Sequence, residues 1–348
     1  MAQPSTDQIH VLVVVPEQEP PVNPPQIFPT YRPNAEGIDL DLPHLSRDEL
    51  VQKLYSAITG TNFVLLSSPA GSGKTSLLTL FARQYPGFRY VPIAFDSATA
   101  DATMILSSHG VDICGKKCVI PRGELCVFMM DDCQRQYKDL DFWTGLIKGS
   151  SSWLPKHVRF IISATHLLET DAPISPVAFS SIPWKLARED FLISDVEAHT
   201  CLALENGLPP SLRHPTFLEV IIRECNRHIG SLRVSINTIY AHFQKGDPTE
   251  HDLLAYYMSG AFVDQMARCF GSDHTTPTHP EHRKFLTLCL VGDPAYQPLV
   301  QKLSHDEEQY FTRLKKAGIV FEDGGYVKFT SPLAERYYYK WLFPVVDM

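Results

Sequence analysis

The chain has 348 residues and a formal net charge of −8 at pH 7. This length suggests about two domains, each large enough to have its own core. The acidic balance argues against a broad nucleic-acid footprint, which needs a basic face, and no apolar run approaches the roughly 18 residues of a membrane span.

The first 43 residues are rich in proline. Residues 10–16 form a short apolar run, HVLVVVP, and prolines recur from there to position 43. This composition predicts a semi-extended segment of polyproline character without a core of its own. The N-terminus has no charged region followed by a long apolar run, so we expect no secretory signal peptide. Ordered sequence resumes near Leu45, where Ser46 and Glu49 predict a capped helix start.

An apolar run at 63–66 predicts a strand, and a glycine-containing loop and a helix follow it. The loop consists of Ser68, Pro69, Ala70, Gly71, Ser72, Gly73, Lys74 and Thr75, and Ser76 continues the helix. Such a loop aims several backbone N–H groups at one point, and the N-terminus of the helix adds positive potential there. The phosphate-binding loop of P-loop NTPases has this layout, so residues 68–75 are a predicted P-loop.

Two side chains of the P-loop have specific roles in this motif. Lys74 is expected to reach the β- and γ-phosphates of ATP, and the Thr75 hydroxyl is expected to take one Mg²⁺ position. Ser68 stands where the motif has its first glycine. Serine tolerates a left-handed backbone less well than glycine does. The alternative is an ordinary Gly/Ser turn before a helix. The order Gly73, Lys74, Thr75 after an apolar strand favours nucleotide binding by residues 68–76.

A second apolar run, at 125–130, ends in two aspartates. An uninterrupted apolar run is typical of a parallel strand buried on both faces, and carboxylates at its C-terminal end would face the ligand crevice. We expect Asp131 to hold Mg²⁺ through water and Asp132 to orient the attacking water. Many ATPases have the longer glutamate at the second position, so slow hydrolysis is expected. The alternative is that the aspartate pair caps the next turn.

A third predicted strand, at 157–162, ends in a group of polar residues. Ser163 and Thr165 are candidates to touch the γ-phosphate or the attacking water, and Thr165 is favoured. A helix cap or turn hydroxyl is the alternative. We interpret His166 as a partner of the local turn. The eight cysteines are scattered and are interpreted as buried or free thiols, because Cys114 and Cys118 lack a second pair at zinc-site spacing.

Composition and the pattern of apolar residues divide the chain into four parts. A Pro-rich segment covers 1–43, an α/β core 44–194, a helical subdomain 195–275 and a C-terminal module 276–348. The fold class is therefore α/β, with a parallel sheet of P-loop NTPase type covered by helices on both faces.

The C-terminal module has the pattern of a winged helix. Helices are predicted at 281–291 and 305–317, and a hairpin follows that turns at Asp323, Gly324 and Gly325. Winged helices can read DNA or can pack as a lid over a nucleotide site. Acidic residues at 306–308 favour packing over DNA reading.

The sequence resembles the Crinkler (CRN) effectors of oomycetes and fungi. Residues 10–16 look like their HVLVVVP junction. The downstream part is similar to their divergent AAA+/STAND-like ATPase module, on residues 67–75, the Asp131–Gln134 run with Tyr137, and residues 329–338. Only nine residues precede the junction, where the family usually has a header domain, so we expect a header-less member, a truncated gene product or a chosen fragment of a longer chain. No separate nuclease or kinase domain is expected.

This resemblance implies ATP and Mg²⁺ as ligands and a role in host–pathogen interaction. Family members are secreted and delivered to host cells, including the host nucleus, whereas a chain without a leader would stay intracellular. The resemblance also implies that Arg47 lies near the adenine, that Pro215 packs against it, and that Arg213 senses nucleotide state. Surface arginines and a plain first-turn proline are the alternatives.

Together these features predict an ATP-binding protein that hydrolyses ATP and rearranges its subdomains with nucleotide state. Lys74, Asp132 and Thr165 would carry the chemistry. The alternative is an interaction protein that nucleotide stabilises without appreciable hydrolysis. Its partners would be host proteins or, less favoured, DNA, and either form is compatible with a homo-oligomer.

Overall fold

A computed structural model shows the arrangement of the chain. The structure describes residues 37–95, 100–166, 182, 184–244, 246–271, 275–290 and 298–343. The HVLVVVP run at 10–16 and most of the Pro-rich segment lie outside the described residues. No helix in the described ranges is both long and apolar enough to cross a membrane.

A five-stranded parallel sheet forms the centre of the N-terminal half. Its strands are β1 (Phe63–Ser67), β2 (Arg89–Ala94), β5 (Cys126–Asp131), β6 (Val158–Ala164) and β7 (Trp184–Leu186). Their order is β2-β5-β6-β1-β7. Strand β6 therefore lies between the strand that precedes the P-loop and the strand that ends in Asp131.

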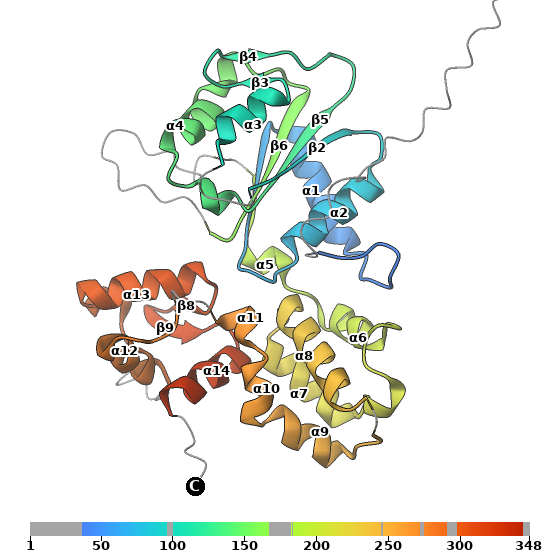
Figure 1. Ribbon diagram of the computed structural model, residues 1–348, viewed down its shortest axis with the longest axis vertical. Coiled ribbons are helices and arrows are strands. Elements are labelled where there is room, and N and C mark those ends of the chain that lie inside the picture. The colour runs from blue at the N-terminus through green and yellow to red at the C-terminus, as the bar shows by residue number, and fades with distance from the viewer. Residues whose placement is uncertain are drawn as a thin grey trace, which may run out of the picture.

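Helices cover both faces of this sheet, as the sequence predicts. Figure 1 shows α1 (Asp48–Gly60) and α2 (Lys74–Gln84) on one side, and α3 (Ala102–Ser108) and α4 (Leu140–Trp143) on the other. Alternate residues of the strands point to opposite faces, so Val127 and Met129 join one apolar cluster and Phe128 and Met130 the other. Every residue of β5 is buried, which confirms the two-sided burial expected from its apolar run.

Small elements complete the N-terminal half. They are the hairpin β3 (Val111–Asp112) and β4 (Lys117–Cys118), and short turns of 3-10 or π type at Cys133–Gln136, Thr144–Lys148 and Ser150–Ser152.

The C-terminal half is mainly helical. The short α5 (Arg188–Phe191) still belongs to the N-terminal half, because Phe191 joins an apolar cluster of the sheet. The first part of the C-terminal half contains α6 (Asp195–Ala203), a 3-10 turn at Pro210–Leu212, α7 (Pro215–Cys225), α8 (Ile229–His242), α9 (Glu250–Tyr257), α10 (Gly260–Asp264) and α11 (Ala267–Phe270). Its second part contains α12 (Pro280–Leu290), a 3-10 turn at Val300–Lys302, α13 (His305–Lys316), β8 (Val320–Asp323), β9 (Tyr326–Phe329) and α14 (Pro332–Leu342). The two predicted helices and the hairpin of the C-terminal module are present, whereas their identity as a winged helix stays a prediction.

Local capping signals explain where several helices begin. Ser194 with Glu197, Thr249 with Asp252 and Ser304 with Glu307 form reciprocal capping boxes. The cap expected at Ser46 is wrong, because Arg47 is the N-cap of α1 and has a left-handed backbone with φ of 53°. The Ser46 hydroxyl donates instead to the Asp48 carboxylate at 2.8 Å.

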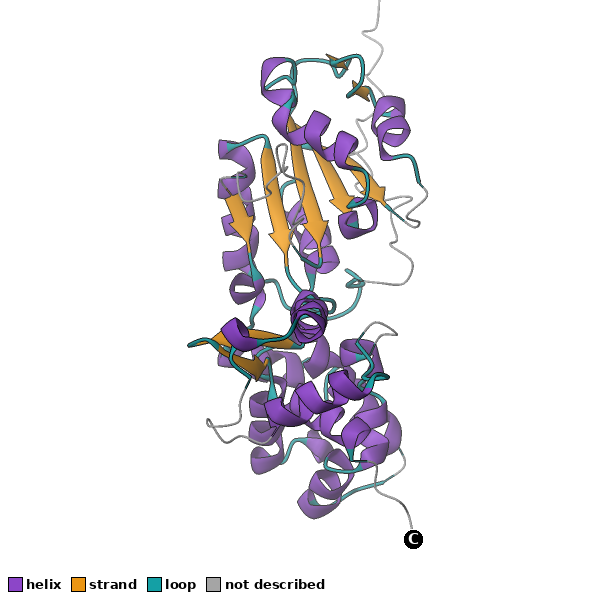
Figure 2. Cartoon of the chain, turned by 90° about the vertical axis from the view of Figure 1, so that its left-hand side faces the viewer, coloured by secondary structure: helices purple, strands orange, loops and turns teal. Residues whose placement is uncertain are grey.

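One continuous apolar cluster holds the C-terminal half together. It extends from Ile193 to Leu342 and includes residues of α7, α8, α12, α13 and α14. Figure 2 shows that the carboxyl ends of the sheet strands point toward this half. The P-loop, which follows β1, therefore lies where the two halves meet, while the domain boundaries at 194 and 275 stay predictions.

Candidate functional site

The P-loop backbone follows the shape that its glycines allow. Gly71 and Gly73 have φ values of 74° and 91°, in the left-handed region that favours glycine. Ser68 is not among the described residues with positive φ, and its N–H donates to Ala164 O at 3.3 Å. The departure from the motif at Ser68 is accommodated because this position does not use a left-handed backbone.

Lys74 is the first residue of α2 and is almost completely buried. Its Nζ donates hydrogen bonds to Ser68 O at 2.6 Å and to Pro69 O at 3.0 Å. These bonds hold the ammonium group at the P-loop, beside the glycine-rich backbone. The lysine therefore supplies a fixed positive charge at the place where the motif binds phosphate.

The structure brings Thr75 and Asp131 together from different elements. Thr75 Oγ1, on α2, donates to Asp131 Oδ2 at 2.7 Å. Asp131 is only 6% exposed, and its Oδ1 accepts from Ser163 Oγ at 2.6 Å and from Asp132 N at 3.0 Å. A hydroxyl and a carboxylate in contact are suitable oxygen ligands for Mg²⁺, directly or through water. Ser163, the less favoured candidate on β6, thus orients Asp131.

Asp132 has a different environment from Asp131. Its backbone is left-handed with φ of 54°, and it precedes the turn at 133–136. Its side chain is 42% exposed, accepts from Gln134 Nε2 at 3.0 Å and pairs with Arg135 at 3.6 Å. These contacts are those of the turn interpretation, whereas the predicted catalytic role stays a prediction.

Gln134 links two of the three residues predicted to carry the chemistry, Asp132 and Thr165. Its Nε2 donates to Asp132, and its Oε1 accepts from the Thr165 N–H at 3.2 Å. The Thr165 hydroxyl is hydrogen-bonded to His166 Nδ1 at 2.9 Å. Sequence reasoning gave Gln134 no role, since nothing local indicates that its amide bridges the ends of β5 and β6.

His166 is held in the local turn, as predicted. Its carbonyl accepts a hydrogen bond from the Tyr137 hydroxyl at 2.5 Å. Burial, together with the nearby Lys316, lowers the pKa of the His166 imidazole to about 4. The ring is therefore neutral at pH 7, and the Lys316 charge comes from the C-terminal module.

Arg47, Arg213 and Pro215 have structural contacts. The Arg47 guanidinium donates to Phe191 O at 3.2 Å and pairs with Glu197 at 3.1 Å, which ties α1 to the start of the C-terminal half. Arg213 donates to the carbonyls of Leu208 and Ala203. Pro215 is the first residue of α7. Their predicted nucleotide contacts stay predictions, and the structure favours no such role for Arg213.

The N-terminus of α8 packs on the P-loop, a contact that the sequence analysis missed. A Cβ on Gly230 would lie 2.4 Å from Gly71 O, so only glycine fits there. His228, the N-cap of α8, accepts from Ser231 N at 3.1 Å and hydrogen-bonds to the backbone of Ala70. Burial, with smaller contributions from nearby cations, lowers the pKa of His228 to about 4, which leaves its ring neutral.

The C-terminal module also contacts the P-loop. A Cβ on Gly318, between α13 and β8, would lie 2.1 Å from Pro69 Cγ, and Gly318 has φ of 72°. Its carbonyl accepts from Thr330 Oγ1 at 2.8 Å. Both parts of the C-terminal half therefore touch the loop.

The residues present fit a nucleotide phosphate chain. The hydroxyls of Ser68 and Ser72 are buried and have no hydrogen-bond partner among the described residues. Buried hydroxyls without partners are costly, and phosphate oxygens would accept from them. Together with Lys74 and the Thr75–Asp131 pair, they form a donor set suited to phosphate with Mg²⁺.

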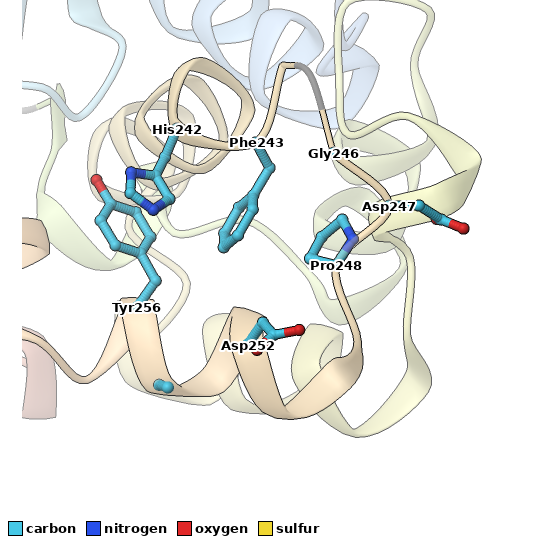
Figure 3. A pocket seen from close by; sticks show the side chains of 8 residues that line it. His242, Phe243, Gly246, Asp247, Pro248, Asp252 and Tyr256 are labelled. Carbon is cyan, nitrogen blue, oxygen red and sulfur yellow. The ribbon is translucent and has the colours of Figure 1, made fainter.

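A separate hollow lies within the helical region. It has a volume of about 460 Å³ and is lined by residues between the end of α8 and α9, including His242, Phe243 and Tyr256 (Figure 3). His242 stacks on Tyr256 with ring centroids 3.6 Å apart. None of the predicted site residues lines this hollow.

No protein-family model and no curated protein matches the chain. Among solved structures, it is similar to a Walker-type ATPase of Pyrococcus abyssi, with a TM-score of 0.55 and 13% identity over 84% of this chain and 95% of that one. The fold is that of a P-loop NTPase.

Two further structures are less similar. They are a RuvB variant of Thermotoga maritima, with a TM-score of 0.46 and 15% identity over 82% of this chain and 90% of that one, and an Orc1 protein of Aeropyrum pernix in complex with DNA, with a TM-score of 0.43 and 16% identity over 89% and 94%. These weaker likenesses carry no argument about activity.

Proposed function

We propose that this protein binds ATP with Mg²⁺ at the P-loop and hydrolyses it slowly. The observation that carries the proposal is the 2.7 Å hydrogen bond between Thr75 Oγ1 and Asp131 Oδ2. It joins the hydroxyl that follows the P-loop lysine to the carboxylate that ends a buried central strand. A turn that merely precedes a helix has no need of this long-range contact.

The roles of the residues follow from their positions. The P-loop N–H groups, Lys74 and the hydroxyls of Ser68 and Ser72 would bind and orient the phosphates. Thr75 and Asp131 would hold Mg²⁺, which supplies electrostatic stabilisation of charge on the phosphates when it is bound. Asp132 or Thr165, linked through Gln134, would orient the attacking water.

Nucleotide would also set the contacts between the two halves. His228 and Gly230 touch the P-loop from α8, and Gly318 touches it from the C-terminal module. Because these contacts are made with Ala70, Gly71 and Pro69, a change in loop shape on binding would reach both parts of the C-terminal half.

The hydrolysis proposal is tested by measuring phosphate release from ATP with Mg²⁺. The unaltered protein should release phosphate, and Lys74→Ala should abolish release. Lys117→Ala is the matched control, because Lys117 is an exposed lysine on β4. Equal release by Lys74→Ala and the unaltered protein would place the activity elsewhere.

A second candidate function is that of a nucleotide-stabilised interaction protein. The exposure of Asp132 and its bonds within the turn at 133–136 favour it, because a water-orienting carboxylate needs a fixed place at the γ-phosphate. Tight ATP binding without phosphate release would support this alternative.

The partners and the cellular role rest on the sequence alone. None of the comparisons supports the Crinkler resemblance, so the roles as a secreted effector, in host-protein binding and in delivery to host cells stay proposals from residues 10–16 and the ATPase-like motifs. DNA binding is disfavoured because the first turn of α13 carries Asp306, Glu307 and Glu308. A homo-oligomer likewise stays a proposal.

A further inference from the structure

Arg188 is a cation beside the P-loop that the nucleotide-binding motifs do not include. It begins α5, two residues after β7 ends at Leu186. Leu186 lies opposite Leu66 in the parallel register of β7 and β1. Since β1 leads directly into the P-loop, Arg188 follows β7 at the same edge of the sheet at which the loop begins.

One hydrogen bond and one electrostatic interaction place the Arg188 side chain near the P-loop. Its guanidinium donates to Thr330 O at 3.4 Å, and Thr330 is bound to Gly318, which packs on Pro69. Its charge also acts on the imidazole of His228, which packs on Gly71 of the P-loop. The guanidinium therefore lies near residues of both parts of the C-terminal half that contact the loop.

The charge of Arg188 has little compensation. Among the described residues, no carboxylate forms an ion pair with it, and its one hydrogen bond is to a neutral carbonyl. Burial lowers the pKa of Arg188, and Glu189 opposes this effect, but an arginine stays protonated in a protein. A partly buried cation without an anionic partner is unfavourable, and a polyphosphate at the P-loop would provide that partner.

We propose that Arg188 binds the phosphate chain of a nucleoside triphosphate at the P-loop. This inference rests on the proposed function, and it adds a contact from α5 to those of the nucleotide-binding motifs. The guanidinium would exchange its long hydrogen bond to Thr330 O for charged bonds to phosphate oxygens. That exchange would remove one of the two side-chain hydrogen bonds that Thr330 O accepts, the other being from Asn226. Nucleotide would therefore loosen the link between α5 and the C-terminal module.

The second donor to Thr330 provides a matched control. Asn226 Nδ2 donates to the same carbonyl at 2.6 Å, and Asn226 has a left-handed backbone with φ of 44°. Asn226→Gly removes this donor and suits the backbone, while it leaves every charge in place. Arg188→Gln has the opposite effect, because it keeps a donor for Thr330 and removes the positive charge.

The test is a titration of each purified protein with ATP and Mg²⁺, with thermal unfolding measured in the absence of nucleotide. Arg188→Gln should weaken ATP binding about tenfold or more, since a hydrogen bond to a charged group contributes at least about one such factor. Arg188→Lys should recover part of the loss. The ATP affinity of Asn226→Gly should lie within about twofold of that of the unaltered protein, because this variant keeps Arg188 and every P-loop residue that would contact the phosphates.

The outcomes separate this inference from the proposed function. If the unaltered protein binds ATP and Lys74→Ala does not, then unchanged binding by Arg188→Gln overturns the role of Arg188 alone. An equal loss in Asn226→Gly also overturns it, because the effect would then come from the Thr330 anchor. If the unaltered protein does not bind ATP, or Lys74→Ala binds it equally well, both proposals fail.

Discussion

The contact between α8 and the P-loop can be tested with a single methyl group. Gly230 is the second residue of α8, and a Cβ there would lie 2.4 Å from Gly71 O and 2.9 Å from Gly71 C and Cα. The atoms that it meets are backbone, so no side chain can rotate away. Gly230→Ala must therefore move the start of α8 away from the P-loop.

Two opposing effects decide how much the free energy of unfolding changes in Gly230→Ala. Overpacking of this kind costs about 1–3 kcal/mol. Alanine in place of glycine within a helix contributes at most about 1 kcal/mol in the other direction. The clash is the larger effect, and we expect a net loss of about 1–2 kcal/mol, which lowers Tm by roughly 1–3 °C in a protein of this size.

The assay is thermal unfolding of Gly230→Ala without nucleotide. Gly87→Ala is the control, because no atom lies within 4 Å of a Cβ at Gly87, in the turn between α2 and β2. A Tm of Gly230→Ala equal to or above that of the unaltered protein would refute the reasoning. Such a result would mean that only the higher helix propensity of alanine affects stability. The N-terminus of α8 would then not pack on the P-loop in solution.

Two more predictions concern turnover and pH. Asp132→Asn should lower phosphate release more than ATP affinity, because the side chain would act on water and not on the bound nucleotide; an equal loss of both would assign Asp132 to metal binding or to structure. His228 is neutral in the folded protein, with a pKa of about 4, well below the ordinary value of 6.5. The unfolded chain therefore binds more protons between these values, and Tm should fall as pH drops from about 6.5 toward 4. In His228→Gln this fall should be smaller, and an identical pH profile in both proteins would remove His228 as its cause.

Local patterns predicted three of the five strands of the sheet, β1, β5 and β6, and the loop that follows β1, whereas β2 and β7 were not predicted. Strand β5 could be predicted because its first five residues, Cys126 to Met130, are all buried and apolar and therefore form an uninterrupted apolar run. The P-loop could be predicted because glycine is required where φ is positive, at Gly71 and Gly73, and lysine follows directly. These signals lie within a few residues of each other, so one sequence suffices to detect them.

The contacts between the two halves could not be predicted in the same way. Gly230 and Gly71 are far apart in the chain, and only a glycine inside a helix hinted at a close approach. Gly318 follows α13, and a glycine just after a helix accounts for its positive φ but not for its contact with Pro69. Arg47 replaced Ser46 as the cap of α1 because its guanidinium binds carbonyls at 190–192, a tertiary contact that outweighs the local preference for serine.

The most direct test of nucleotide binding at the P-loop is an ATP titration, with Mg²⁺, of the unaltered protein, Lys74→Ala and Lys117→Ala. Lys74 holds its charge at the loop through bonds to Ser68 O and Pro69 O, whereas Lys117 is exposed on β4. Saturable binding by the unaltered protein and by Lys117→Ala, with loss of tight binding in Lys74→Ala, is the expected result. Equal affinity in all three proteins would show that ATP does not bind at this loop.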